Sequence, residues 1–61
     1  MKVAIIEAKT GKVVCSYPII LHGLNYKPSD EEYFAEAWKN AVGDGLVDAD
    51  ARDKYRFTLS Q

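Results

Sequence analysis

Residues 28–45 read PSDEEYFAEAWKNAVGDG, and this stretch decides the fold. It opens with Ser29 and Glu32 at the spacing of a capping box, in which each side chain satisfies a backbone N–H group at a helix start. The two acidic residues between them place negative charge at the positive end of the helix dipole. Two glycines close the stretch, and glycine readily adopts the positive φ at which many helices end. The sequence therefore predicts one helix over about residues 30–43.

The predicted helix is amphipathic. Its apolar residues recur at the spacings of a single stripe: Phe34, Ala37, Trp38, Ala41 and Val42. The two alanines predict that the helix axis lies close to the surface on which it packs. Because the sequence predicts only one long helix, we expect that surface to be one face of a β-sheet.

Strand patterns lie on both sides of the helix. Residues 2–8 and 13–21 are rich in β-branched side chains, which favour strands, and residues 55–60 alternate strictly between apolar and polar. The segment 9–12 predicts a hairpin loop with Gly11 in the left-handed conformation. After the helix, we expect Leu46 and Val47 to fold back under the helix end. Asp48 is then expected to cap a short turn over residues 49–53.

The order strand, strand, helix, strand predicts a small α+β domain of ββαβ type over residues 1–61. Pro18 cannot donate a ladder hydrogen bond, so the second strand belongs at the sheet edge. The last strand then lies beside the first as its antiparallel neighbour. The prediction is a two-layer domain with a three-stranded, mostly antiparallel sheet in order 2-1-3 and one helix packed on one face.

Both faces of this sheet are apolar in the sequence. We assign Val3, Ile5, Val13, Cys15, Tyr17, Ile19 and Leu21 to the face that the helix covers, and Ser16 to the opposite face. Antiparallel sheets that meet water on one side normally carry polar residues there. The candidate interaction surface on the opposite face consists of Ala4, Ile6, Val14, Ile20 and Arg56.

Two kinds of cover would shield that second face. One is the loop from His22 to Lys27, which brings Leu24 and Tyr26. The other is a second protein surface, because contiguous exposed apolar area usually marks an interaction site. We expect a homodimer, or binding of another protein, through the open sheet face or an edge strand, and a non-enzymatic role for the domain.

Catalytic and metal-binding patterns are weak. Cys15 and His22 suggest a nucleophile and a base, but they lie on opposite strand parities, and a buried lone cysteine behaves as a small apolar residue. An EF-hand loop starting at Asp48 would need glycine where Asp53 stands and glutamate where Leu59 stands. The acidic residues of the first helical turns are explained by the helix start. We therefore predict no catalytic residue, no metal and no cofactor.

Charge and composition limit the classes of function and partner that remain. Eight basic and nine acidic residues give a net charge of −1, which argues against nucleic-acid binding through phosphate neutralisation. A weaker pattern favours nucleic-acid contact, because Arg52, Lys54 and Arg56 are interleaved with aromatic residues. The single cysteine excludes an internal disulfide. The first apolar stretch ends at Glu7 and is therefore too short for a signal peptide or a membrane span. We expect a cytoplasmic protein without membrane contact.

One resemblance to a known family follows from the pattern. A hairpin with the step Tyr17-Pro18, a short loop, Ser29 with Glu31 and Glu32 opening a helix, and Asn40-Ala41 near its end is similar to small antitoxins of the HicB type. The similarity covers roughly two-thirds of the chain and is one of fold pattern. It implies a regulatory protein that contacts a protein toxin or nucleic acid. The DNA-binding segment of those antitoxins has no counterpart among residues 1–61.

Overall fold

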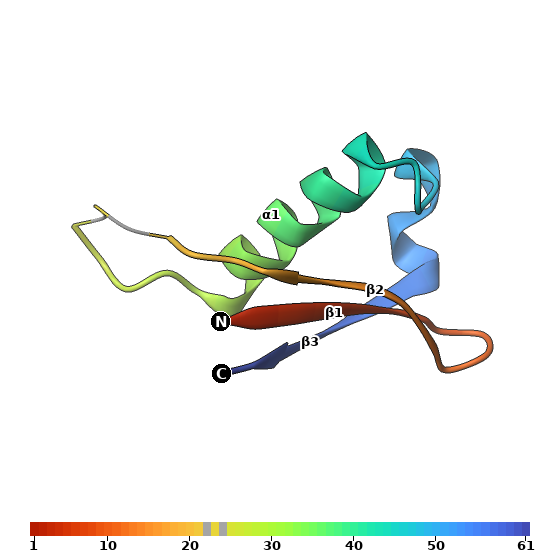
Figure 1. The fold of residues 1–61 in the computed structure, drawn as a ribbon, viewed down its shortest axis with the longest axis horizontal. Coiled ribbons are helices and arrows are strands. Elements are labelled where there is room, and N and C mark those ends of the chain that lie inside the picture. Colours follow the sequence, from red (N-terminus) through yellow and green to blue (C-terminus); the bar gives the residue numbers. More distant parts are fainter. Residues whose placement is uncertain (22, 24) are drawn as a thin grey trace.

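The computed structural model describes residues 1–21, 23 and 25–61. The elements in chain order are β1 (Lys2–Glu7), β2 (Lys12–Pro18), α1 (Asp30–Gly43), the 3-10 helix η1 (Ala49–Lys54) and β3 (Tyr55–Ser60). The strands form one antiparallel sheet in order β2-β1-β3, and α1 lies on one side of it (Figure 1). The predicted ββαβ fold and strand order are confirmed.

The first hairpin follows the sequence closely. Gly11 adopts φ 73°, and its N–H donates to the carbonyl of Glu7 at 2.8 Å. Strand β2 is shorter than the predicted 13–21 because its pairing with β1 ends when the Ile19 N–H reaches the carbonyl of Met1 at 2.8 Å. The edge position inferred from Pro18 is confirmed.

A β-bulge in the hairpin changes one prediction. Ile5 pairs with Cys15, but Ile6 pairs with Val13, so Val14 is left as the extra residue. A bulge of this kind shifts the side chains that precede it relative to the other strand. Val13 therefore shares a face with Ile6, and its predicted place beside Cys15 on the helix face is wrong.

The core lies between α1 and one face of the sheet. It consists of Val3, Ile5, Ile19, Ala37 and Ala41, all buried. Both alanines have no exposed surface, which agrees with the predicted close approach of the helix to the strands. Four of the five stripe residues, Phe34, Ala37, Trp38 and Ala41, are therefore confirmed as part of the packing face.

Aromatic side chains extend this core toward β3. The rings of Phe34 and Phe57 stack with centroids 5.3 Å apart. Trp38 lies 5.4 Å from Tyr55 and 6.0 Å from Phe57 in tilted and edge-on arrangements, which are favourable geometries for aromatic pairs. The contact between helix and last strand is thus mainly aromatic.

The helix start differs from the predicted capping box. Ser29 is the N-cap residue with extended backbone angles, but its side chain makes no capping hydrogen bond. Its carbonyl instead accepts the N–H of Glu32 at 3.1 Å. The carboxylate of Glu32 accepts the hydroxyl of Tyr26 at 3.1 Å, so it binds the preceding loop and not the backbone of Ser29.

The helix ends in a Schellman motif. Gly45 has φ 71°, its N–H donates to Val42 O at 3.1 Å, and the Leu46 N–H donates to Ala41 O at 3.0 Å. Val47 packs against the core as expected. Leu46 does not fold under the helix, because its side chain is 50% exposed.

The predicted turn before the last strand is confirmed as η1. Asp48 precedes it, and its Oδ1 accepts the N–H of Asp50 at 3.0 Å. This bond satisfies one of the open donors at the start of a helical turn. The turn ends at Lys54, directly before β3 begins.

Removing either large aromatic contact should unfold much of the population. We expect Trp38→Ala or Phe57→Ala to lower the free energy of unfolding by about 3–5 kcal/mol. A domain of this size has a small free energy of unfolding, so a loss of this magnitude leaves much of it unfolded. Urea unfolding followed by circular dichroism measures the effect, and midpoints near that of the wild type would contradict the aromatic core.

The two caps give a matched pair of variants. Asp48→Ala should lower the free energy of unfolding by about 1 kcal/mol, because a capping hydrogen bond is lost. Ser29→Ala should lower it by only a few tenths of a kcal/mol, since the Ser29 side chain makes no such bond. Equal losses in thermal or urea unfolding would show that Ser29 caps the helix in solution.

Candidate interaction surface

The face of the sheet opposite α1 is called the open face here. Its members follow from the strand register, because directly paired residues of antiparallel strands share a face. They are Lys2, Ala4 and Ile6 on β1, Val13, Ser16 and Pro18 on β2, and Arg56, Thr58 and Ser60 on β3.

The structure places three of the predicted surface residues on the open face. Ala4 and Ile6 lie on the central strand and are half-buried, and Arg56 is exposed opposite Ile6. Val14 lies in the bulge and is half-buried. Ile20 lies beyond the end of β2 and is 68% exposed.

Val13 also belongs to this surface, although the sequence pattern assigns it to the face that the helix covers. It is paired with Ile6 and is 59% exposed. Strict alternation along β2 assigns it to the core face, and only the bulge reverses that assignment. Nothing in the run of apolar residues from 13 to 15 marks where the extra residue falls.

The loop before α1 is held by the helix. The Tyr26 hydroxyl donates to the Glu32 carboxylate, and this hydrogen bond raises the pKa of the Tyr26 phenol. The contact attaches this part of the loop to the first turn of α1 and not to the open face. His22 and Leu24 lie outside the described residues, so their predicted roles stay predictions.

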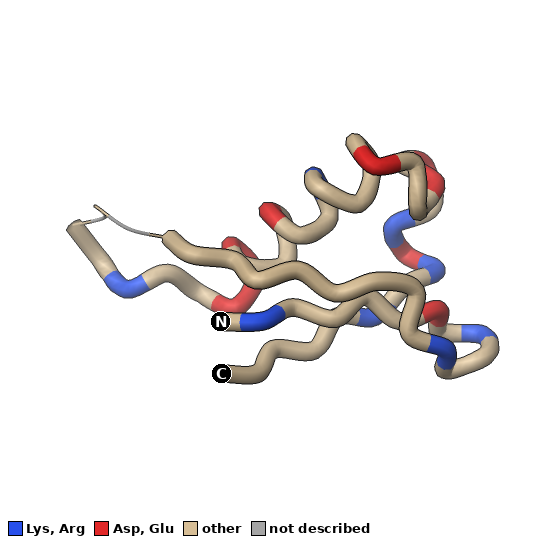
Figure 2. Tube along the Cα trace, viewed as in Figure 1, with Lys and Arg blue, Asp and Glu red and all other residues tan. Residues whose placement is uncertain are grey.

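Charge is divided unequally between the two layers. Glu7 is the one acidic residue that precedes residue 30 in the sequence. The others lie along α1, in the segment that leads into η1 and in η1 itself (Figure 2). The charged residues whose register places them on the open face are Lys2 and Arg56, both basic. The open face thus combines apolar side chains, among them Ala4, Ile6 and Val13, with hydroxyl-bearing and basic ones, and the helix layer is acidic.

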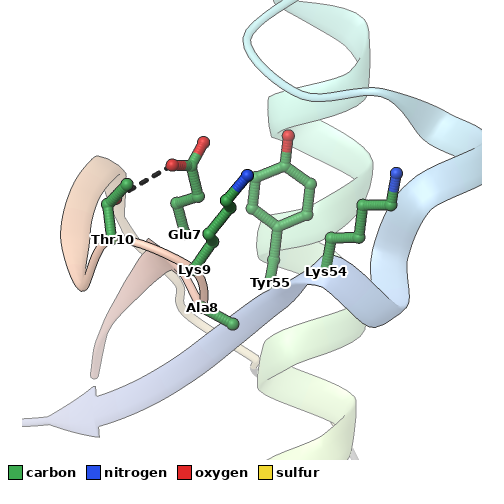
Figure 3. Close-up of a pocket in the computed structure, with 6 residues that line it drawn as sticks. All are labelled: Glu7, Ala8, Lys9, Thr10, Lys54 and Tyr55. Atoms are coloured by element: carbon green, nitrogen blue, oxygen red, sulfur yellow. Dashed lines mark hydrogen bonds between the residues drawn. The ribbon is translucent and has the colours of Figure 1, made fainter.

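A hollow of about 740 Å³ lies at the hairpin end of the sheet. It is lined by Glu7, Ala8, Lys9, Thr10, Lys54 and Tyr55 (Figure 3). The Thr10 hydroxyl donates to Glu7 Oε1 at 2.9 Å. The two lysines stand on either side of the tyrosine ring, without a second carboxylate to form an acid–base pair.

Cys15 has the environment of a structural thiol. It is half-buried and packs against the core, and burial raises its pKa. A nucleophilic cysteine needs the opposite shift, toward the thiolate. Within the described ranges, no cluster of histidine, cysteine and acidic side chains has the geometry to hold a metal ion.

The basic run near the C-terminus is divided between both layers. Arg52 forms an ion pair with Glu31 and lies 5.2 Å above the Phe57 ring, on the helix side. Arg56 lies on the open face. Because Phe57 is part of the aromatic core, these residues do not form one surface on which bases could stack.

Comparison with known proteins identifies no relative. No family model matches the chain, and no curated protein or solved structure matches it at a significant level. None of the helices in the described ranges combines the length and apolar character needed to cross a bilayer.

A hydrogen bond joins the sheet to the helix end. The Tyr17 hydroxyl donates to Asp44 Oδ2 at 2.7 Å, and this bond raises the pKa of the Tyr17 phenol above its ordinary value. At neutral pH we expect Tyr17→Phe to lower the free energy of unfolding by about 0.5–1 kcal/mol, as for a partly exposed hydrogen bond.

The pH dependence of that difference follows from the raised pKa. The stabilisation is present below the ordinary pKa of tyrosine, about 10. It decreases as pH rises above this value, because the unfolded chain loses the proton first. Urea unfolding of wild type and Tyr17→Phe at neutral and alkaline pH measures the difference. A gap that stays constant up to about pH 11 would contradict the pKa shift.

Proposed function

We propose that this domain is a small non-enzymatic interaction module that binds a second copy of itself, or another protein, through its sheet. The observation that carries the proposal is the open face. It presents Ala4, Ile6 and Val13 on the side of the strands away from α1, and Val13 is 59% exposed. An antiparallel sheet that only meets water normally has polar residues at such positions.

The size of the domain supports the same proposal. A chain of this length buries only about 60% of the surface that its unfolded form exposes. Among the residues that the structure describes, the fully buried side chains of appreciable size are only Val3 and Ile5. Small domains commonly gain stability from association when disulfides and metals do not supply it.

The non-enzymatic part of the proposal rests on Cys15. Its thiol is packed against the core and its pKa is raised, so it favours the protonated form that is a poor nucleophile. A lone thiol also fits a reducing compartment. We therefore include a cytoplasmic location in the proposal.

A second candidate is a regulatory protein of antitoxin type. The ββαβ order supports it, since the hairpin and helix follow the pattern that resembles small antitoxins of the HicB type. In that case the partner is a protein toxin or nucleic acid. Affinity capture that recovers neither kind of partner from the native host would count against this candidate.

Association should be visible in the purified protein. We expect sedimentation equilibrium from micromolar to millimolar concentration to show the apparent mass rising from one chain toward two. A single-chain mass over the whole range would contradict self-association.

Leu46→Lys is the control for this measurement. Leu46 is an exposed apolar side chain, but it lies after α1 and not in the sheet. The variant should associate like the wild type. If it abolished association, the contact would belong to the helix end.

A further inference from the structure

We propose that β3 pairs along its outer edge with β3 of a second copy, in antiparallel orientation. This inference rests on the proposed self-association and specifies which part of the sheet carries it. β3 is the last strand of the sheet, with β1 on one side, and it lies along the lower margin of the molecule in Figure 1. The direction of its backbone groups, the protection of the opposite edge and the charge pattern support this pairing.

Hydrogen-bonded and non-hydrogen-bonded pairs alternate along an antiparallel ladder. The Ala8 N–H donates to the carbonyl of Lys54 at 3.0 Å, which fixes the phase of this alternation between β1 and β3. Two and four residues further along, the backbone groups of Arg56 and Thr58 therefore point toward β1.

The residues between them point the other way. Phe57 and Leu59 direct their N–H and C=O groups to the outer edge of β3. This edge is regular, because β3 contains neither proline nor glycine and its register with β1 has no bulge. It is a template for the addition of another strand.

The opposite edge of the sheet is protected. The bond from the Ile19 N–H to Met1 O sets the alternation on β2, so Ser16 and Pro18 face outward. Pro18 has no N–H to donate, and the bulge at Val14 interrupts the regular spacing. Proline and bulges are the devices by which edge strands avoid further pairing. Of the two edges, only that of β3 is suited to accept a strand.

The sequence of β3 is compatible with its own two-fold copy. Pairing centred on Phe57 sets Phe57 opposite Phe57 of the second copy, and Tyr55 opposite Leu59, all on the helix side. On the open face it sets Arg56 opposite Thr58, so no like charges meet. Aromatic and β-branched cross-strand pairs stabilise a ladder, whereas like charges directly opposite destabilise it.

Contact between two open faces is less favourable. It would bring Lys2 and Arg56 of both copies into one layer, and the register gives that face no acidic residue to pair with them. Charges that lose water without gaining a partner carry a desolvation cost. Edge pairing avoids this cost and joins two three-stranded sheets into one continuous sheet.

Backbone N-methylation tests the pairing directly, and a chain of this length is accessible to chemical synthesis. An N-methyl group on Phe57 removes one outward donor per copy and leaves the side chain in the core. We expect self-association to weaken by about 30-fold or more, because two-fold symmetry removes two hydrogen bonds. The circular dichroism spectrum of the monomer should remain that of the wild type.

Two matched variants separate the edge of β3 from the other surfaces. N-methylation of Ser16 places the same group on the outer edge of β2, and Ile6→Lys places a charge on the open face. Both should associate like the wild type. If Ile6→Lys weakens association and N-methyl-Phe57 does not, the β3 pairing is wrong while self-association through the open face stands.

Amide hydrogen exchange of the unmodified protein gives a second readout that does not depend on a variant. As the concentration rises through the association range, the amides of Phe57 and Leu59 should become protected and that of Ser16 should not. Association without protection of the two β3 amides would overturn the pairing. A single-chain mass at every concentration would overturn the pairing and the proposed self-association together.

Discussion

The contact of α1 with one face of the sheet is the constraint on which the rest of the structure depends. Ala37 and Ala41 are buried together with Val3 and Ile5, so the helix backbone lies close to the strands. A helix covers one side of a sheet only. The apolar residues that alternate onto the other side therefore remain at the surface of a single copy.

The sheet is asymmetric in a second way. One edge carries Pro18 and a bulge, and the other carries a regular strand whose outward backbone groups are intact. The charges are also divided: most acidic residues lie in the helix layer (Figure 2), and the strand register places Lys2 and Arg56 on the open face. Natural proteins commonly protect an edge where pairing would be harmful. An edge that is left unprotected on β3 alone is consistent with a strand that pairs with a partner.

The sequence was sufficient for the elements and their order, because each depends on local chemistry. The glycine turn, the amphipathic stripe and the alternation of β3 identify the elements, and Pro18 on an edge strand leads to the order of the strands. Details that depend on the assembled fold were wrong. A bulge moved Val13 from one face to the other, and Tyr26 engaged the Glu32 side chain assigned to the cap. The difference between the two edges needed the hydrogen-bond phase, which no residue pattern records.

The most direct test of this account is methyl relaxation by a soluble paramagnetic agent, measured on a dilute, monomeric sample. The account predicts strong enhancement for the methyl groups of Ala4, Ile6 and Val13, and little for those of Val3 and Ile5. The contradicting result is equal protection of Ile6 and Ile5. It would mean that one copy covers both faces of its own sheet, so that the open face would no longer support the proposed interaction.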